Sequence, residues 1–206
     1  MPSKKTKKRK PPSKPAPKTS NKNRMRILKS RITYRAPVFY VTSEVVKEPS
    51  GITARRDVIR HPGSVVILPV DESGLEPLVL LERQFRYAAG KELWELPAGR
   101  IDEGESALEG AKRELLEETG YSAKKWKRAL YFYVSPGFLT ETMSVYLAQG
   151  LERGKATPEA DEVIQCKMFP LSSVMKMVMT GRIEDAKTIS GVLWFSQYLQ
   201  EHLTKA

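Results

Sequence analysis

Residues 99–121 read GRIDEGESALEGAKRELLEETGY and contain the strongest local pattern in the chain. Ser106 and Glu109 have the S-x-x-E spacing of a capping box, and Gly120 stands where helices commonly end in a left-handed residue. These signals predict a helix from about residue 107 to residue 119. The segment before it, 92–99, leads into the helix through a proline and a glycine.

Two stripes run along the predicted helix. Three apolar residues share helical spacing and can face a core: Leu108, Ala111 and Leu115. Three glutamates fall on the neighbouring stripe: Glu114, Glu117 and Glu118. Like charges three and four positions apart destabilise a helix, so this cluster needs a compensating partner. Gly110 lies on the same side and costs about 1 kcal/mol relative to alanine, which makes sense if a ligand or backbone approaches closely.

Convergent carboxylates are a typical ligand set for a hard divalent cation, and Mg²⁺ often combines a few of them with waters and substrate phosphates. A cation would relieve the repulsion among the glutamates, and Arg113 can pair with Glu117 at i+4. The alternative is a solvated outer helix face with surface ion pairs. The helix alone leaves both interpretations open.

Length and composition suit a soluble globular protein with one ordinary domain, or with a domain and an appendage. The chain has 206 residues, of which 40% are hydrophobic and 29% charged. No apolar run approaches the roughly 18 residues of a membrane span, so no membrane partner is expected. The basic N-terminus has no apolar segment after it, and a lone Cys166 excludes an intramolecular disulfide framework. The cytoplasm is the expected location.

The net charge of +11 is concentrated at the N-terminus. Residues 1–30 contain 12 lysines and arginines and no acidic residue, so the rest of the chain has 23 basic against 24 acidic side chains. With its prolines and few apolar residues, the segment 1–25 is predicted to be a disordered basic tail. Such a tail can contact nucleic acid or an anionic surface through counterion release, or serve only solubility.

The rest of the sequence predicts many strands and few helices, which indicates an α+β fold. A strand-like pattern begins near residue 27, and residues 151–162 look like a polar loop. Two further helices are predicted at 171–180 and 185–202. The remaining predicted strands are 36–46, 54–61, 64–70, 78–86, 123–136, 141–150 and 163–171.

The spacing in residues 99–121 resembles the signature of the Nudix hydrolases, G-x5-E-x7-R-E-U-x-E-E-x-G-U, where U is aliphatic. Its fixed positions are matched by Gly99, Glu105, Arg113, Glu114, Glu117, Glu118 and Gly120, with Leu115 at the first apolar position. Only Tyr121 departs, which we expect to alter packing rather than chemistry. Seven fixed identities coincide by chance at roughly 10⁻⁸ per starting position, so the match is specific.

Beyond the signature, about residues 40–195 resemble the ADP-ribose pyrophosphatase branch of that family. The shared segments are RQFRY (83–87), ELWELPAG (92–99), SPGFLTE (135–141), an acidic pair (161–162) and GRIEDAKT (181–188), with Pro136 at the offset typical of that branch. The resemblance implies an α/β/α sandwich around a mixed sheet in residues 63–206. It also implies that an N-terminal β-region, residues 26–62, helps to form a homodimer.

The implied reaction is metal-dependent hydrolysis of the diphosphate of ADP-ribose, or of a related nucleoside diphosphate sugar, to AMP and a sugar phosphate. Divalent ions neutralise the diphosphate and lower the pKa of the attacking water. The resemblance implies Mg²⁺, with Mn²⁺ as an alternative. Its implied ligands are the carbonyl of Ala98 and the carboxylates of Glu114, Glu117, Glu118 and Glu162. Arg113 is expected to hold the glutamates, and Glu105 to fix the loop and the helix.

The general base is expected on an acidic loop with the pattern D-E-x-E-x-I in relatives. Aligning the apolar residues that follow places Glu162 at a metal-site position and Ala160 where the base is expected. A shift of two residues makes Glu162 the base instead, and Glu159 is the next candidate.

For the substrate, the resemblance implies a diphosphate contact by Arg86, a second by Arg56 from the N-terminal region, and loop contacts at Gly137 and Glu141. Phe39 and Tyr40 are candidates for stacking on the adenine, although strand aromatics are commonly core residues. Two alternative functions stay open. One is a pyrophosphatase for GDP-mannose or another sugar nucleotide, and the other is a catalytically weak, nucleic-acid-associated Nudix protein acting through its tail.

Overall fold

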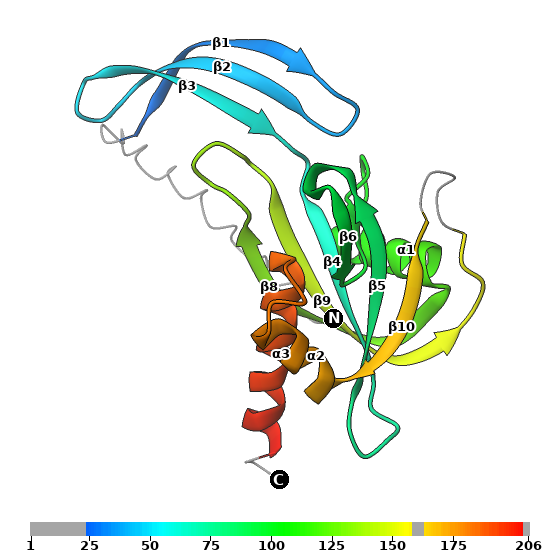
Figure 1. The fold of residues 1–206 in the computed structure, drawn as a ribbon. Helices are drawn as coiled ribbons and strands as arrows, with labels where there is room; N and C mark the ends of the chain where they lie inside the picture. Colours follow the sequence, from blue (N-terminus) through cyan, green and yellow to red (C-terminus); the bar gives the residue numbers. More distant parts are fainter. Residues whose placement is uncertain (1–23, 158–162, 204–206) are drawn as a thin grey trace, which may run out of the picture.

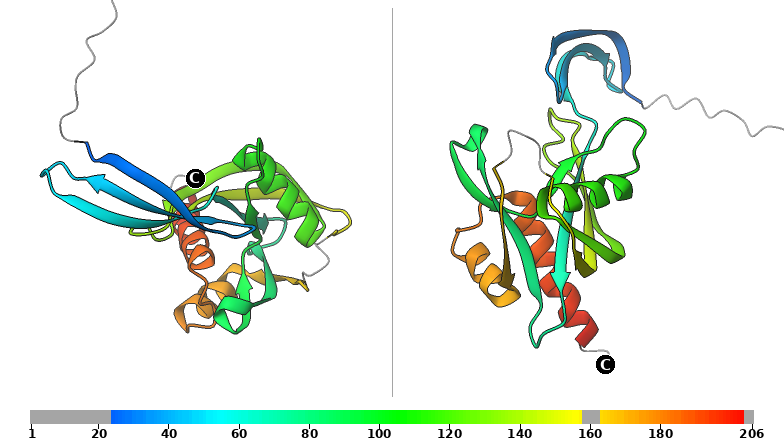
Figure 2. Two further views of the ribbon diagram at one scale, coloured as in Figure 1. Left: turned by 90° about the horizontal axis from the view of Figure 1, so that it is seen from above. Right: turned by 90° about the vertical axis from the view of Figure 1, so that its right-hand side faces the viewer.

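The computed structural model describes residues 24–157 and 163–203, which form two sheets and three α-helices (Figure 1). The smaller sheet is antiparallel and stands apart from the body of the molecule (Figures 1 and 2). Its strands are β1 (Arg26–Arg35), β2 (Tyr40–Lys47) and β3 (Thr53–Arg60). Of the predicted tail, residues 1–23 lie outside the described part of the chain.

The larger sheet has seven strands in the order β10-β5-β4-β9-β8, with β6 paired to β5 and β7 paired to β4. It is mixed, because β4 and β9 are parallel while the other pairs are antiparallel. Its strands are β4 (Ser64–Asp71), β5 (Leu78–Arg86), β6 (Lys91–Glu95), β7 (Ala98–Arg100), β8 (Tyr121–Tyr133), β9 (Thr142–Arg153) and β10 (Gln165–Pro170), with a short 3₁₀ turn, Tyr87–Ala89, before β6.

Helices cover both faces of this sheet. Helix α1 (Ala107–Thr119) packs on one face, and α2 (Leu171–Met179) with α3 (Ala186–Leu203) packs on the other. Strand β4 is continuously apolar because both of its faces are buried. Val66 and Leu68 contribute to the core under α2 and α3, whereas Val65 and Ile67 contribute to the core under α1. The predicted α/β/α sandwich is therefore confirmed.

The three predicted helices are present, but several strand and loop boundaries were predicted wrongly; β8, for example, ends at Tyr133 and not at residue 136. Residues 151–153 were expected in a polar loop, yet they extend β9, and Arg153 pairs with Tyr121 at the start of β8. Polar side chains suit the end of β9 because Glu152 and Arg153 are exposed, and Glu152 forms an ion pair with Lys124 at 2.7 Å. Residues 36–39, expected in a strand, form the turn between β1 and β2, where Ala36 N donates to Phe39 O at 2.8 Å.

The small sheet contacts the body at two points. The backbone of Ile59, near the end of β3, bonds with Phe138 O at 2.8 Å and Thr140 N at 2.9 Å, in the loop before β9. The turn 36–39 is held by Arg100, whose Nη1 donates to Pro37 O at 3.3 Å. These contacts bring the tip of the β1–β2 hairpin next to β7. None of the helices in the described part of the chain is long and apolar enough to cross a membrane.

Candidate active site

Helix α1 begins and ends as its sequence predicts. Ser106 Oγ accepts from Glu109 N at 3.3 Å, and Glu109 Oε2 accepts from Ser106 N at 2.9 Å, so the capping box is complete. At the other end Gly120 has φ of 71°, and its N–H donates to Leu116 O at 2.9 Å. The two caps set the length of the helix, and with it the position of every glutamate on the helix.

A cavity of about 590 Å³ lies between α1, β7 and the tip of the β1–β2 hairpin. It gathers the predicted residues from both sides of the signature together with Arg86 from the end of β5. Its lining consists of Pro37, Val38, Arg86, Ala98, Gly99, Arg100, Asp102, Arg113, Glu114, Glu117 and Glu118. Four of the five predicted metal-site residues and two of the predicted arginines therefore share one cavity.

Arg113 is the centre of the acidic cluster. Its Nε donates to Glu105 Oε1 at 3.0 Å, and its Nη1 donates to Glu114 Oε1 at 2.8 Å and Glu117 Oε2 at 3.0 Å. The hydrogen bond to Glu105 raises the pKa of Arg113, while the same bond holds the pKa of Glu105 below its ordinary value. The repulsion expected among the glutamates is thus offset by one guanidinium, and the predicted i,i+4 pair is confirmed.

Two glutamates one helical turn apart meet the backbone of β7. Glu118 is buried, and its Oε2 accepts from Ala98 N at 3.1 Å. The Glu114 carboxylate lies so close to Gly99 that a Cβ built there would be 1.9 Å from Glu114 Oε1. Only glycine leaves room for this carboxylate.

Gly110 makes room for a side chain, and not for the ligand or backbone that its place on the acidic side suggested. A Cβ at Gly110 would be 2.9 Å from Glu105 Oε2, so the glycine makes space for the partner of Arg113. Glu105 Oε2 also accepts from Asp102 N at 3.1 Å and thereby ties the loop to the helix, as predicted.

The donor set in the cavity suits a hard divalent cation, because it consists of carboxylate and backbone oxygens without sulfur or imidazole. Across residues 24–157 and 163–203, no three acidic, histidine or cysteine side chains already share the geometry of one ion. The reason is visible in the hydrogen bonds, since Arg113 draws Glu114 and Glu117 toward itself. The chemistry of these carboxylates fits a divalent metal.

Arg86, at the end of β5, also lines the cavity and is held by Glu95. Its Nε donates to Glu95 Oε1 at 3.0 Å and its Nη2 to Glu95 Oε2 at 2.8 Å. Burial acts to lower the pKa of Arg86, but the hydrogen bonds to Glu95 outweigh it and raise the pKa. Glu95 is almost fully buried and is bound on its other side by Lys187. The sequence analysis missed Glu95 and Lys187, although both lie in the quoted segments ELWELPAG and GRIEDAKT.

Acid is expected to destabilise the fold partly through Glu95. Burial acts to raise the pKa of Glu95, yet the bonds from Arg86 and the charge of Lys187 lower it below 4.5. Its stabilising contribution is therefore complete above pH 4.5 and is lost as the pH falls through the folded-state pKa. In urea denaturation below pH 4.5, the free energy of unfolding of Glu95→Gln should fall less steeply than that of the wild type. Parallel slopes would contradict this assignment.

Three predicted substrate residues do not line this cavity. Arg56 lies on β3, where its Nη2 forms an ion pair with Glu48 at 2.6 Å. Glu141 accepts from Ser64 Oγ at 2.7 Å at the start of β9. Gly137 is exposed in the loop before β9. The N-terminal sheet stands away from the body of its own chain, so one chain by itself does not bring Arg56 to the site (Figure 1).

The predicted base candidates, Glu159 and Glu162, lie outside the described residues, as does Ala160. The residues that flank this segment are anchored at the end of α1. Thr157 N donates to Glu117 O at 2.9 Å, and Cys166 Sγ lies 3.7 Å from Glu118 O in a weak hydrogen bond. Both flanks therefore lie beside the two last glutamates of the helix.

Comparison with known proteins gives a family and a fold. The NUDIX domain matches residues 60–190. The chain is 36% identical over 159 residues to the ADP-ribose pyrophosphatase of Bacillus subtilis (strain 168), covering 76% of this chain and 82% of that protein. It is also 36% identical over 152 residues to the GDP-mannose pyrophosphatase of Yersinia enterocolitica serotype O:8, covering 69% of this chain and 75% of that protein.

The crystal structure of an ADP compounds hydrolase superposes with a TM-score of 0.73 at 23% identity, covering 86% of this chain and 95% of that chain. At this identity the superposition shows the fold. Enzymes of the Nudix family generally need divalent metal ions, which agrees with the oxygen donors in the cavity. The signature runs from β7 to the end of α1 with Tyr121 as its departure, and Glu114, Glu117 and Glu118 line one cavity. Together with the match to the NUDIX domain over residues 60–190, this shows that the protein belongs to the Nudix hydrolase family.

Proposed function

We propose that this chain hydrolyses the diphosphate of ADP-ribose, or of a closely related nucleoside diphosphate sugar, to AMP and a sugar phosphate, with Mg²⁺ as the metal and Mn²⁺ as a substitute. The observation that carries this proposal is the cavity in which Glu114, Glu117 and Glu118 face Arg86. Carboxylates on one side and a guanidinium on the other are the groups needed to hold a metal-bound diphosphate. The Bacillus subtilis relative supports the choice of ADP-ribose.

In this proposal Glu114, Glu118 and the carbonyl of Ala98 hold the ion, and Glu117 is a further ligand or orients one. When bound, the ion neutralises charge on the diphosphate and lowers the pKa of the attacking water. Arg113 holds Glu114 and Glu117 through its Nη1 and is itself held by two bonds to Glu105, at 3.0 and 3.1 Å, so it would position these carboxylates for the ion.

We assign the general base to the acidic segment 159–162, with Glu162 first and Glu159 second. The support is the anchoring of its flanks by Glu117 O and Glu118 O at the end of α1. Gly120 contributes to the same anchor, because its carbonyl accepts from Gly154 N at 2.6 Å. A base from this segment would act on a water at the ion.

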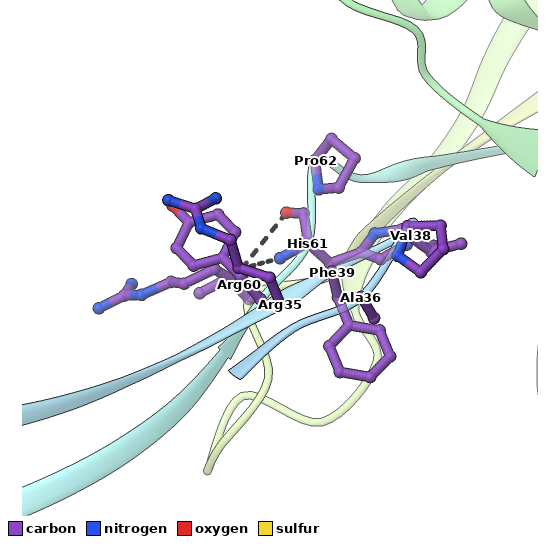
Figure 3. Close-up of a pocket in the computed structure, with 10 residues that line it drawn as sticks. Arg35, Ala36, Val38, Phe39, Arg60, His61 and Pro62 are labelled. Carbon is purple, nitrogen blue, oxygen red and sulfur yellow. Dashed lines mark hydrogen bonds between the residues drawn. The ribbon is translucent and has the colours of Figure 1, made fainter. Parts of the chain in front are cut away.

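We place the nucleobase in a second cavity of about 510 Å³, whose lining residues are drawn in Figure 3. Phe39 and Tyr40 line it and offer stacking surfaces, while Pro37 and Val38 line both cavities. Tyr40 is 38% exposed, so it is not a core residue. Other lining residues include Arg35, Arg60 and His61 (Figure 3).

We further propose that the β-region 26–62 forms a homodimer, leaving residues 63–206 as the catalytic domain. Every residue of β1 is exposed, including Ile27, Ile32 and Tyr34. An exposed apolar edge strand is a common pairing surface. In such a dimer Arg56 would be placed to approach the partner's cavity, which would account for its distance from the cavity of its own chain. The basic tail stays a predicted contact for nucleic acid or an anionic surface, and the cytoplasm stays the predicted location.

The substrate is tested by a panel of nucleotide sugars at saturating Mg²⁺, scored by release of the nucleoside monophosphate. We expect kcat/KM for ADP-ribose to exceed that for GDP-mannose by about tenfold or more, the equivalent of about 1.4 kcal/mol. GDP-mannose is the second candidate because the Yersinia enterocolitica relative is equally identical to this chain. Faster turnover of GDP-mannose would reverse the assignment.

A further inference from the structure

Four charged groups of alternating sign form a chain from the active-site cavity to the start of α3. Arg86 lines the cavity and binds Glu95 through one edge of its guanidinium, formed by Nε and Nη2. Glu95 Oε2 also accepts from Lys187 Nζ at 2.5 Å, and Lys187 Nζ lies 3.1 Å from Asp185 Oδ1. The chain thus joins residues about a hundred positions apart in sequence.

The middle of this chain is buried, which makes its pairing energetically important. Glu95 is 1% exposed and Lys187 is 8% exposed. A buried charge is costly unless it is both paired and hydrogen-bonded. Arg86 donates to both oxygens of the Glu95 carboxylate, and Lys187 adds a second cation at Oε2, so this buried charge is both paired and hydrogen-bonded.

The end of the chain is fixed by the N-terminus of α3. Asp185 Oδ2 accepts from Thr188 N at 3.0 Å, which is the arrangement of a helix N-cap. Thr188 Oγ1 accepts from Leu96 N at 2.7 Å, so the same turn also holds the residue after Glu95. The first turn of α3 therefore anchors the backbone that leads to Ala98 as well as the side chain that holds Arg86.

The geometry leaves one edge of Arg86 for a ligand. Its Nε and Nη2 donate to Glu95, whereas its Nη1 makes no hydrogen bond to any of residues 24–157 and 163–203. If Glu95 had Arg86 as its sole partner, the pair would be close to neutral toward the cavity. Because Lys187 shares Glu95, more of the positive charge of Arg86 remains available to an anion, and Asp185, which offsets Lys187, is the member of the chain most removed from Arg86.

We propose that Lys187 is a positioning residue for the substrate's diphosphate, acting through Glu95 to hold Arg86 with Nη1 toward the cavity and to preserve its positive charge there. This inference rests on the proposed function in so far as it takes the ligand to be a diphosphate. It gives a role to Lys187 and Thr188 at the end of the segment GRIEDAKT, which contact Glu95 and Leu96.

The test compares Lys187→Met with Lys91→Met. Lys91 is a matched control, because it also joins β6 to the segment before α3, through an ion pair with Glu184, but it is exposed and outside the chain of charges. We expect Lys187→Met to raise KM for ADP-ribose by about tenfold with kcat changed less than about threefold, since a lost diphosphate contact is made equally in ground and transition states. Lys91→Met should leave both constants unchanged.

A double-mutant cycle separates positioning from mere stability. If Lys187 acts through Arg86, Lys187→Met adds nothing to KM in an Arg86→Ala background, whereas independent effects multiply. Lys187→Gln keeps a hydrogen-bond donor for Glu95 and provides a second uncharged variant if Lys187→Met fails to fold. Multiplying effects, or an unchanged KM in a folded Lys187 variant, would overturn the inference.

Binding of inorganic pyrophosphate with Mg²⁺, measured by titration calorimetry, keeps the two proposals apart. If the wild type fails to hydrolyse ADP-ribose, the proposed substrate is wrong, but the network still predicts about tenfold weaker pyrophosphate binding by Lys187→Met than by Lys91→Met. Equal pyrophosphate affinities with normal ADP-ribose hydrolysis would reject the network and leave the proposed function standing.

Discussion

Replacing Glu118 with glutamine is expected to lower kcat for ADP-ribose by about 1,000-fold or more, the equivalent of about 4 kcal/mol in activation free energy. Glutamine keeps an oxygen that can accept from Ala98 N, the bond that Glu118 makes at 3.1 Å, so the fold should be retained. What is lost is the negative charge that would hold a divalent ion. Glu114→Gln should behave in the same way.

Glu118→Gln is expected to lose activity without losing stability. Glu114 and Glu118 are four positions apart on α1, and removing one of two like charges at this spacing stabilises a helix by about 0.2–0.5 kcal/mol. We therefore expect the free energy of unfolding of Glu118→Gln to be unchanged or slightly raised, as measured by urea denaturation. A large loss of stability would mean that the loss of activity has a structural cause.

Glu109→Gln is the matched control on the same helix. Glu109 belongs to the capping box, whose third position accepts either glutamate or glutamine, and it lies outside the cavity. Its substitution should leave kcat unchanged. If Glu118→Gln lost less than about tenfold, the chain would instead fit the catalytically weak, nucleic-acid-associated alternative.

Gly99→Ala is expected to reduce kcat by about 100-fold with less than about 1 kcal/mol lost in the free energy of unfolding. The new Cβ would lie 1.9 Å from Glu114 Oε1, so the carboxylate must leave the position it occupies. Since the clashing atoms are the end of a long side chain, the fold accommodates the change. The active site does not, because Glu114 can no longer occupy that position.

Gly120→Ala, in contrast to Gly99→Ala, should mainly reduce the stability of the fold. Gly120 has φ of 71°, and a Cβ there would be 2.7 Å from Ala156 N, which is backbone. The left-handed conformation alone costs about 1–2 kcal/mol for a residue with a side chain. Stability measured by urea denaturation should therefore fall more than for Gly99→Ala.

Gly137→Ala completes the comparison as a neutral control for stability, because a Cβ at this position would have no described atom within 4 Å and the φ of Gly137 is not positive. Equal losses of activity and stability in Gly99→Ala would contradict a local effect on Glu114. A loss of activity in Gly137→Ala without a loss of stability would support the predicted substrate contact at Gly137.

The sequence by itself was sufficient for the parts of this protein that depend on neighbouring residues. The capping box, the left-handed Gly120 and the i,i+4 pair of Arg113 and Glu117 are interactions within one helix, so spacing alone predicts them. The burial of β4 on both of its faces follows in the same way from a continuous apolar run. The family signature adds the roles of the glutamates because its spacing is specific.

Only the tertiary structure showed which distant residues meet. The pairing of β5 with β6 sets Arg86 beside Glu95, and the first turn of α3 supplies Lys187 from 92 positions away. No local pattern in the sequence encodes that contact, because it depends on how a helix packs against a sheet. The same holds for Arg56, whose distance from the cavity follows from the separate N-terminal sheet. Local hydrogen bonds determine where elements begin and end, whereas the burial of apolar faces determines which elements meet.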